Sequence, residues 1–124
     1  MKIRNLPIGD VHPYERNPRL NDCAVEKVAA SIREFGWRQP IVVDAEMVVI
    51  AGHTRLKAAV LLGHDKIPVH VAEGLTPDQV RAYRLADNRT GEDAQWDIDR
   101  LGLELGDLNL AGYPLELTGF DEAE

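Results

Sequence analysis

Apolar residues recur at helical spacing in two early segments of the chain. Between the candidate N-caps Asn21 or Asp22 and the helix-ending Gly36, they follow an i, i+3, i+4, i+7 pattern: Val25, Val28, Ala29, Ile32 and Phe35. A second helix is expected over residues 53–62, followed by Gly63 in the left-handed position that ends many helices. Three of its residues are expected to face the core: Leu56, Ala59 and Val60.

Two further helices are predicted in the second half of the chain. Thr76–Gln79 forms a capping box with Pro77 at the first helical position, and this helix runs toward Asp87–Arg89. Residues 108–124 are acidic and rich in turn-forming residues, which predicts a tail or linker. Between the helix that begins at Thr76 and this tail, a shorter helix is expected from Asp97 to Leu105. Three of its residues are expected to face inward: Ile98, Leu101 and Leu105.

Four segments have the composition of short β-strands. Ala45-Glu46 separates two of them and predicts a hairpin, and Pro68 in the last one favours a strand start or an edge strand. Residues 11–19 contain two prolines and predict an ordered loop, in which Tyr14 either stacks on a base or anchors the loop. The strands are Lys2–Ile8, Pro40–Asp44, Met47–Ala51 and Lys66–Val71.

The composition is that of one small globular domain. The chain has 124 residues, 44% of them hydrophobic and 28% charged. Cys23 is the single cysteine, which excludes an internal disulfide and suggests a reducing compartment. The apolar runs are too short to cross a membrane, so we expect a cytoplasmic protein with no membrane partner.

Charge is distributed unevenly. The net charge is −7, yet residues 1–72 contain ten Lys and Arg against eight Asp and Glu, whereas residues 73–124 contain four against thirteen. The first part can face an anion and the second part repels one. We therefore predict a functional core over residues 1–92 and an acidic helical extension with a linker-like tail over residues 93–124.

The segment Gly52–Arg55 has the pattern of a phosphate site. A strand ends in glycine, and a helix begins at once with a hydroxyl and basic residues, although a helix N-terminus normally favours acidic ones. No Asp or Glu occurs from Met47 to His64. A bound anion would be stabilised both by the positive end of the helix dipole and by the basic side chains. It would be held by backbone N–H groups, the Thr54 hydroxyl and Arg55. In the alternative interpretation, Thr54 only caps the helix while Arg55 and Lys57 point into solvent.

Several motifs in one order resemble the N-terminal domain of ParB-type partition proteins and, more distantly, sulfiredoxin. The resemblance covers about residues 3–92 and implies an α+β fold, a ParB/sulfiredoxin-like small mixed sheet flanked by helices. The matching segments are Asn17–Arg19, Val28–Gly36, Gln39–Val43, Ala51–Arg55 with Ala58 and Ala59, Leu62–Gly63, Ile67–Val69 and Ala86–Arg89.

The resemblance also implies a nucleotide site. In ParB proteins the segment like Gly52–Arg55 cradles a triphosphate, here CTP or ATP, and the segment like Asp87–Asn88 supplies an acid and an amide near Mg²⁺. The alternative is that Asp87 only closes a helix, although a carboxylate at a helix C-terminus opposes the dipole. The implied nucleotide-binding residues are Arg19, Gly52, His53, Thr54, Arg55 and Asn88, and the implied metal ligands are Asp87 and Asn88.

The chain departs from these families at His53. ParB proteins have Glu-Arg-Arg after the glycine, and sulfiredoxin has its reactive cysteine there, so sulfinic acid reduction is excluded. His53 is either a general base, with Asp87 as the second catalytic candidate, or a hydrogen-bonding residue that covers the helix N-terminus. Arg84–Arg89 and Leu117–Glu122 further resemble the ParB-like domains fused to phage and prophage DNA methyltransferases. The 124 residues contain no methyltransferase motif, and we expect neither a helix-turn-helix nor a dimerisation domain among them.

Three functions follow from these observations. The first is nucleotide binding, with or without slow hydrolysis, for a DNA-modifying or DNA-partitioning system that the chain serves directly or through a fused or partner protein. The second is a metal-dependent DNA phosphodiesterase, which usually needs paired acidic ligands that the first 72 residues lack. The third is an interaction module with a vestigial pocket. In the first case, Arg55→Ala should lose phosphate affinity but keep the fold, because an exposed first-turn arginine contributes little to stability.

Overall fold

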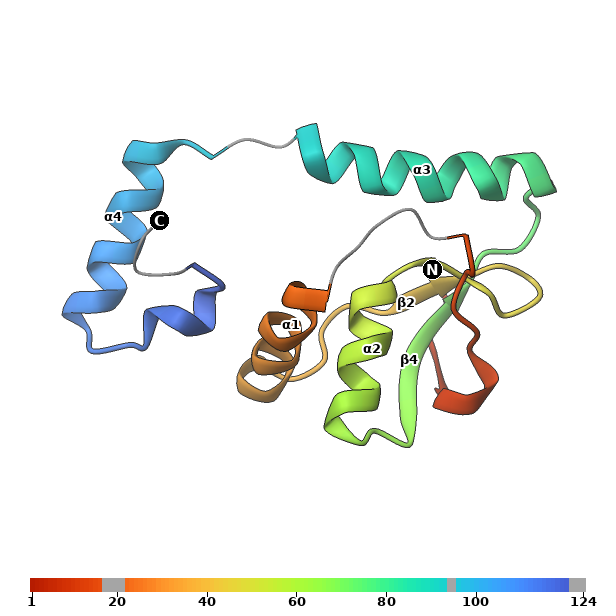
Figure 1. Cartoon of the computed structure of the whole chain (residues 1–124), viewed down its shortest axis with the longest axis horizontal. Coiled ribbons are helices and arrows are strands. Elements are labelled where there is room, and N and C mark those ends of the chain that lie inside the picture. Colours follow the sequence, from red (N-terminus) through yellow and green to blue (C-terminus); the bar gives the residue numbers. More distant parts are fainter. Residues whose placement is uncertain (17–21, 94–95, 121–124) are drawn as a thin grey trace.

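The computed structural model describes residues 1–16, 22–93 and 96–120 and shows a mixed α+β fold (Figure 1). The expected fold class is therefore confirmed. In these described residues, two one-turn helices, η1 (Ile8–Asp10) and η2 (Leu115–Thr118), accompany four strands and four longer helices. The strands are β1 (Arg4–Pro7), β2 (Ile41–Val43), β3 (Val49–Ala51) and β4 (Lys66–Val71), and the helices are α1 (Asp22–Phe35), α2 (His53–Leu62), α3 (Pro77–Asp93) and α4 (Ile98–Leu110).

The four strands form one sheet in the order β1-β4-β2-β3. β1 pairs antiparallel with β4, β4 pairs parallel with β2, and β2 and β3 form the predicted antiparallel hairpin. β4 is thus an internal strand, and the expectation that Pro68 marks a strand start or an edge is wrong. Pro68 lies opposite Asn5 of β1, and its missing N–H affects the ladder with only one of the two neighbouring strands.

The core lies between the sheet and α2. Its buried side chains come mainly from β2, β3, β4 and α2, with one from the loop after η1: Val11, Ile41, Val43, Val49, Leu56, Ala59, Ile67 and Val69. α2 packs on β2, and α1 packs beside α2, while α3 runs past the β3 edge of the sheet (Figure 1). The N-terminus of α2 therefore lies at the end of β3, on the side of the sheet that α3 passes (Figure 1).

Three of the predicted inward positions are exposed. Val60 is 66% exposed, and Ala58 is buried in its place, because α2 packs against both α1 and the sheet and its two alanines, Ala58 and Ala59, face these neighbours. Phe35 is 45% exposed at the last turn of α1. Ile98 is 72% exposed, and the other two predicted inward residues of α4, Leu101 and Leu105, are only half-buried.

Two predicted boundaries also differ from the structure. α3 continues past Asp87–Arg89 to Asp93. Residues 108–110 belong to α4 and residues 115–118 form η2, which packs against α1, so the expectation of a linker-like tail is wrong for the described part of this segment. The division into two units at residue 92 stays a prediction.

Candidate phosphate site at the N-terminus of α2

Gly52 makes the sharp turn from β3 into α2. Its φ is +106° and ψ is 25°, a left-handed conformation that glycine adopts without strain. A Cβ at this position would lie 3.2 Å from Cγ1 of Ile41 and 3.4 Å from its Cα, so the backbone of α2 starts in close contact with β2. Glycine is therefore required both by the turn and by the packing.

The first turn of α2 provides backbone donors without any carboxylate. The first intrahelical hydrogen bond runs from the Leu56 N–H to the Gly52 carbonyl oxygen at 2.9 Å, and the N–H groups before it lie outside the helix's own ladder. No acidic residue occurs in this turn. The N-cap is Gly52 and Thr54 is the second residue of α2, so Thr54 does not occupy the N-cap position that the alternative interpretation gave it.

Arg55 is half-buried beside this turn, rather than exposed as the sequence analysis expected. Its guanidinium donates to the side-chain oxygen of Gln39, whose backbone carbonyl accepts from the Trp37 indole N–H. Burial lowers the pKa of Arg55, and the Asp87 carboxylate raises it again in part. Arg55 thus lies between the α1–β2 loop and α3, with its charge partly removed from water.

Asp87 approaches this site from the interior of α3. The helix continues for six residues beyond it, so the interpretation that Asp87 closes a helix and opposes its dipole is wrong. Its side chain is exposed, and its charge acts on Arg55. Asn88 lies in the same helix, but its side chain and the whole of Arg19 are outside the described residues.

His53 bonds to the loop that precedes α1 and not to its own helix. Its Nε2 accepts a hydrogen bond from the Tyr14 backbone N–H at 3.2 Å, which requires an unprotonated Nε2. Burial, followed by the positive charges of Arg84 and Lys57, lowers the pKa of His53. The neutral imidazole is therefore the form that this contact selects, and a general-base role for His53 stays a prediction.

Three residues that are not among the predicted site residues support the site: Gln39, Asp44 and Arg84. Gln39 holds Arg55, and the guanidinium carbon of Arg84 lies 4.0 Å from the centre of the Tyr14 ring. One face of Tyr14 is thus covered by Arg84, which fits the loop-anchor interpretation of this tyrosine. In the sequence, Arg84 is marked only as the first residue of the Arg84–Arg89 motif, which does not indicate that its side chain is buried or that it contacts Tyr14 and Asp44.

A cavity of about 380 Å³ adjoins Arg55 on the side of α1. It lies between the last turns of α1 and the loop into β2, and its wall combines aromatic, amide and basic groups. Its lining includes Ser31, Phe35, Trp37, Arg38, Gln39 and Arg55.

Two kinds of feature are missing from the described part of the chain. Within residues 1–16, 22–93 and 96–120, no three His, Cys, Asp or Glu side chains come together as a metal-binding group. In the same ranges, none of the helices combines the length and the apolar composition needed to cross a bilayer.

Comparison with known proteins agrees with this architecture. Residues 1–89 match the family model of the ParB N-terminal domain. The chain belongs to this family. The resemblance to ParB proteins drawn from the sequence motifs is thereby confirmed, whereas the link to phage methyltransferases stays a prediction.

Relatives of this ParB N-terminal domain include short and long proteins. The ParB-like nuclease domain-containing protein YnaK of Escherichia coli K12 is 39% identical over 80 residues, which cover 64% of this chain and 92% of YnaK. The nucleoid occlusion protein of Bacillus cereus AH187 is 33% identical over 98 residues, or 74% of this chain. The chain spans 33% of that protein's length.

Solved structures extend the likeness to three dimensions. The C-terminally truncated chromosome-partitioning protein ParB from Caulobacter crescentus, crystallised in complex with CTP-γ-S, matches with a TM-score of 0.76 and 25% identity. This match covers 95% of the present chain and 69% of that chain. Sulfiredoxin from Arabidopsis thaliana matches with a TM-score of 0.56 and 26% identity, over 67% of this chain and 97% of its own.

Proposed function

We propose that this ParB N-terminal domain binds a nucleoside triphosphate, CTP or ATP, with its phosphates at the N-terminus of α2. The observation that supports this most is the half-buried Arg55 guanidinium beside a first helical turn that has donors and no carboxylate. Both groups are positive, and burial disfavours the arginine charge. A bound phosphate stabilises both at once.

Asp87 has a different role in the same site. Mg²⁺ is usually bound by one or two carboxylates together with the phosphates of its nucleotide, and it keeps several waters. Among the described side chains, Asp87 is the carboxylate whose charge acts on Arg55, so it would hold the ion against the phosphates. When bound, Mg²⁺ supplies charge neutralisation at the phosphate oxygens.

The nucleoside would occupy the cavity that adjoins Arg55. Trp37 and Phe35 offer apolar surface there, and Ser31 and Arg38 offer polar groups that can bond a base or sugar. Because Arg55 is part of the cavity wall, one ligand can contact the guanidinium with a phosphate and fill the cavity with its base. The CTP-γ-S complex of the Caulobacter crescentus protein supports a nucleotide in a domain of this fold.

We further propose that the domain serves a DNA-acting system through a fused or partner protein. The chain has a net charge of −7, and phosphate contacts by Lys and Arg dominate DNA affinity. Direct binding of duplex DNA by this chain alone should therefore be weak at physiological salt. The Bacillus relatives, named for nucleoid occlusion, support a role near DNA.

Calorimetric titration with CTP, ATP and GTP, each with and without Mg²⁺, tests the proposal. Saturable binding of CTP or ATP is expected, and binding of none of the three would overturn it. Trp37 provides an independent optical signal because it is in the cavity wall. The chain has two tryptophans, so Trp96→Phe removes the exposed one and leaves Trp37 as the sole reporter.

Arg55→Ala is the decisive variant. It should lower nucleotide affinity by about tenfold or more, since a hydrogen bond to a charged group is worth about 1.5–3 kcal/mol. Arg100→Ala is the matched control, because it removes the same charge from an exposed position on α4 and should bind as the wild type does. Nicking of plasmid DNA that depends on Arg55, without nucleotide binding, would instead support the phosphodiesterase function.

A further inference from the structure

Arg84 is a buried charge that the proposed nucleotide contacts do not use. The residue is 7% exposed, and it is the one charged residue that is buried in the described part of the chain. Burying a guanidinium costs free energy unless its donors are bonded and its charge is paired. The groups that bond to the Arg84 guanidinium therefore indicate its role in the structure.

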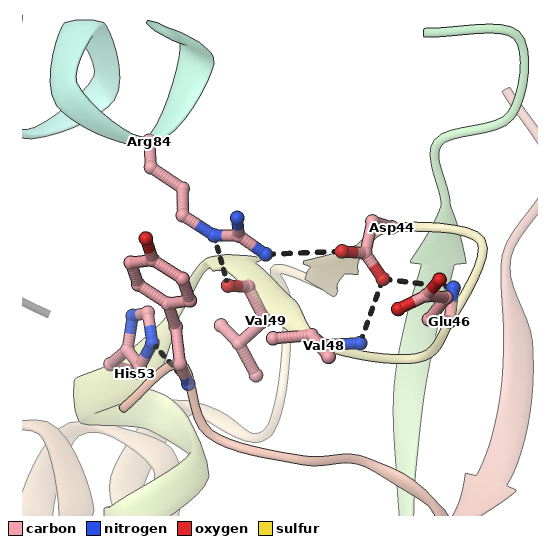
Figure 2. A network of polar contacts seen from close by, with 7 residues as sticks. Asp44, Glu46, Val48, Val49, His53 and Arg84 are labelled. Atoms are coloured by element: carbon pink, nitrogen blue, oxygen red, sulfur yellow. Dashed lines mark hydrogen bonds and ion pairs between the residues drawn. The ribbon is translucent and has the colours of Figure 1, made fainter. Parts of the chain in front are cut away.

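The guanidinium of Arg84 connects α3 to the β2–β3 hairpin (Figure 2). Nε donates to the Val49 carbonyl oxygen at 2.9 Å, and Nη2 donates to Oδ2 of Asp44 at 3.2 Å. The other oxygen of Asp44 accepts the N–H groups of Glu46 and Val48 at 2.9 and 3.0 Å. Arg84 is thus fixed on a carboxylate that is itself fixed by the hairpin turn.

The same guanidinium also fixes the loop that leads to His53. It stacks on the Tyr14 ring at 4.0 Å, and the Tyr14 backbone N–H donates to Nε2 of His53 at 3.2 Å. The charged groups that act on His53 are Arg84 from α3 and Lys57 from α2, and both, together with burial, lower the pKa of His53. Arg84 therefore contributes both to the position of the Tyr14 donor and to the neutral state of its acceptor.

Arg84 anchors α3 one turn before Asp87. Residues three apart lie on the same side of a helix, so the position of Arg84 sets that of Asp87. Val80 and Arg84 are the two buried side chains of α3 among those described, which leaves few other contacts to hold the helix. The Asp87 carboxylate in turn acts on Arg55.

We propose that Arg84 is a positioning residue for the phosphate site, which it reaches along two routes. One route runs through Tyr14 to His53, and the other runs along α3 to Asp87 and Arg55. The inference rests on the proposed function, because Arg84 can position a phosphate site only if the site binds phosphate. It adds to that function a residue that itself touches no ligand.

Arg84→Met tests the inference, with Arg81→Met as control. Methionine fills most of the space but removes the stack, both hydrogen bonds and the charge. Arg81 lies one turn earlier on α3 and is exposed, so its replacement changes the net charge equally. Arg84→Met should weaken nucleotide binding by about tenfold, the size of coupling expected through a packed network, and Arg81→Met should not weaken it.

Two further measurements separate positioning from simple stabilisation. In an NMR titration, the pKa of His53 should rise in Arg84→Met, and the amide signal of Tyr14 should shift. If both signals stay unchanged in a folded variant, Arg84 does not act on His53 through Tyr14, and this route of the proposal is wrong. Because the single variant leaves Asp44 without its partner, the second variant combines Arg84→Met with Asp44→Asn, in which the side-chain amide removes that charge and keeps an oxygen for the turn.

The outcomes distinguish this inference from the proposed function. If the wild type binds no nucleotide, both fail, and this is known before any Arg84 variant is made. If the wild type binds and a folded Arg84 variant binds equally well with an unchanged His53 titration, the inference alone is wrong. Loss of affinity with a raised His53 pKa supports it.

Discussion

The turn from β3 into α2 depends on a glycine because two constraints meet at residue 52. Its φ of +106° lies in the left-handed region, and a Cβ there would lie 3.2 Å from Cγ1 of Ile41. Gly63, which ends the same helix with a φ of +75°, has only the first constraint, because nothing lies within 4 Å of its Cβ position. Comparing the two glycines therefore separates backbone strain from crowding.

Gly52→Ala should lower the free energy of unfolding by about 2–4 kcal/mol, and Gly63→Ala by about 1 kcal/mol. The left-handed conformation costs both alanines a similar amount, but only at residue 52 must Ile41 also move. Urea denaturation followed by circular dichroism measures both losses. Equal losses would contradict the crowding argument.

His53 links the stability of the site to pH. The fold favours its neutral form, so its pKa is lower in the folded chain than in the unfolded chain. The unfolded chain then takes up the proton first as the pH falls. Stability from neutral His53 is complete above the unfolded-state pKa of about 6.5 and is lost as the pH falls from there toward the lower folded-state pKa.

Between about pH 7.5 and about pH 5.5, the unfolding free energy of the wild type should fall more steeply than that of His53→Gln. The glutamine carbonyl can accept the Tyr14 N–H at any pH in this range, so the variant lacks this source of pH dependence. Denaturant midpoints along a pH series measure the two slopes. His12→Gln, at an exposed histidine, is the control, and the expectation is wrong if it flattens the slope as much as His53→Gln does.

At the scale of the elements, the sequence predicted those helix, strand and turn positions that neighbouring residues in the chain determine. α2 and β4 have the predicted bounds because glycines flank the helix and a β-branched run forms the strand. α3 exceeds its predicted end at Asp87–Arg89 because these residues lower helix propensity without stopping a helix. The hairpin turn at Ala45-Glu46 is also confirmed, and the side chain of Asp44 supplies the bonds that hold it.

The part of the site that sequence reasoning missed depends on distant contacts. Arg84 lies 35 residues from Val49 and 40 residues from Asp44 along the chain, and no local pattern indicates that these groups meet. The motif Gly52–Arg55 was found because its glycine, its helix start and its basic residues are adjacent in the sequence. The motif therefore predicted the anion site but not the side chains that position it.

The start of α3 allows a test of a single element. The Gln79 N–H donates to the Thr76 hydroxyl at 3.2 Å, and the Thr76 N–H donates to the Gln79 side chain at 2.9 Å, which confirms the predicted capping box. Thr76→Ala should lower the unfolding free energy by about 1 kcal/mol, measured by thermal and urea denaturation. Thr76→Ser keeps the hydroxyl and should retain most of this stability; an equal loss in both variants would show that the cap bond contributes nothing.

At the scale of the whole molecule, the sheet with α2 and the segment of α4 and η2 differ in the contacts that stabilise them. The sheet and α2 enclose the buried core, whereas α4 and η2 contain no buried residue. Two of the contacts that join the second part to α1 are exposed: the Lys27 ammonium donates to the Gly119 carbonyl oxygen at 3.0 Å, and the Tyr113 hydroxyl donates to the Glu34 carboxylate at 2.6 Å. Exposed polar contacts of this kind add little stability.

Amide hydrogen exchange should therefore separate the two parts of the intact chain. Amides of α4 should exchange through local opening, much faster than those of β2 and β4, which should exchange only when the whole domain unfolds. Tyr113→Phe removes the hydroxyl that bonds Glu34 and should speed exchange in α4 without changing β4. Mass spectrometry of peptides from both regions measures the rates, and equal protection of α4 and β4 would mean that the acidic extension unfolds together with the core.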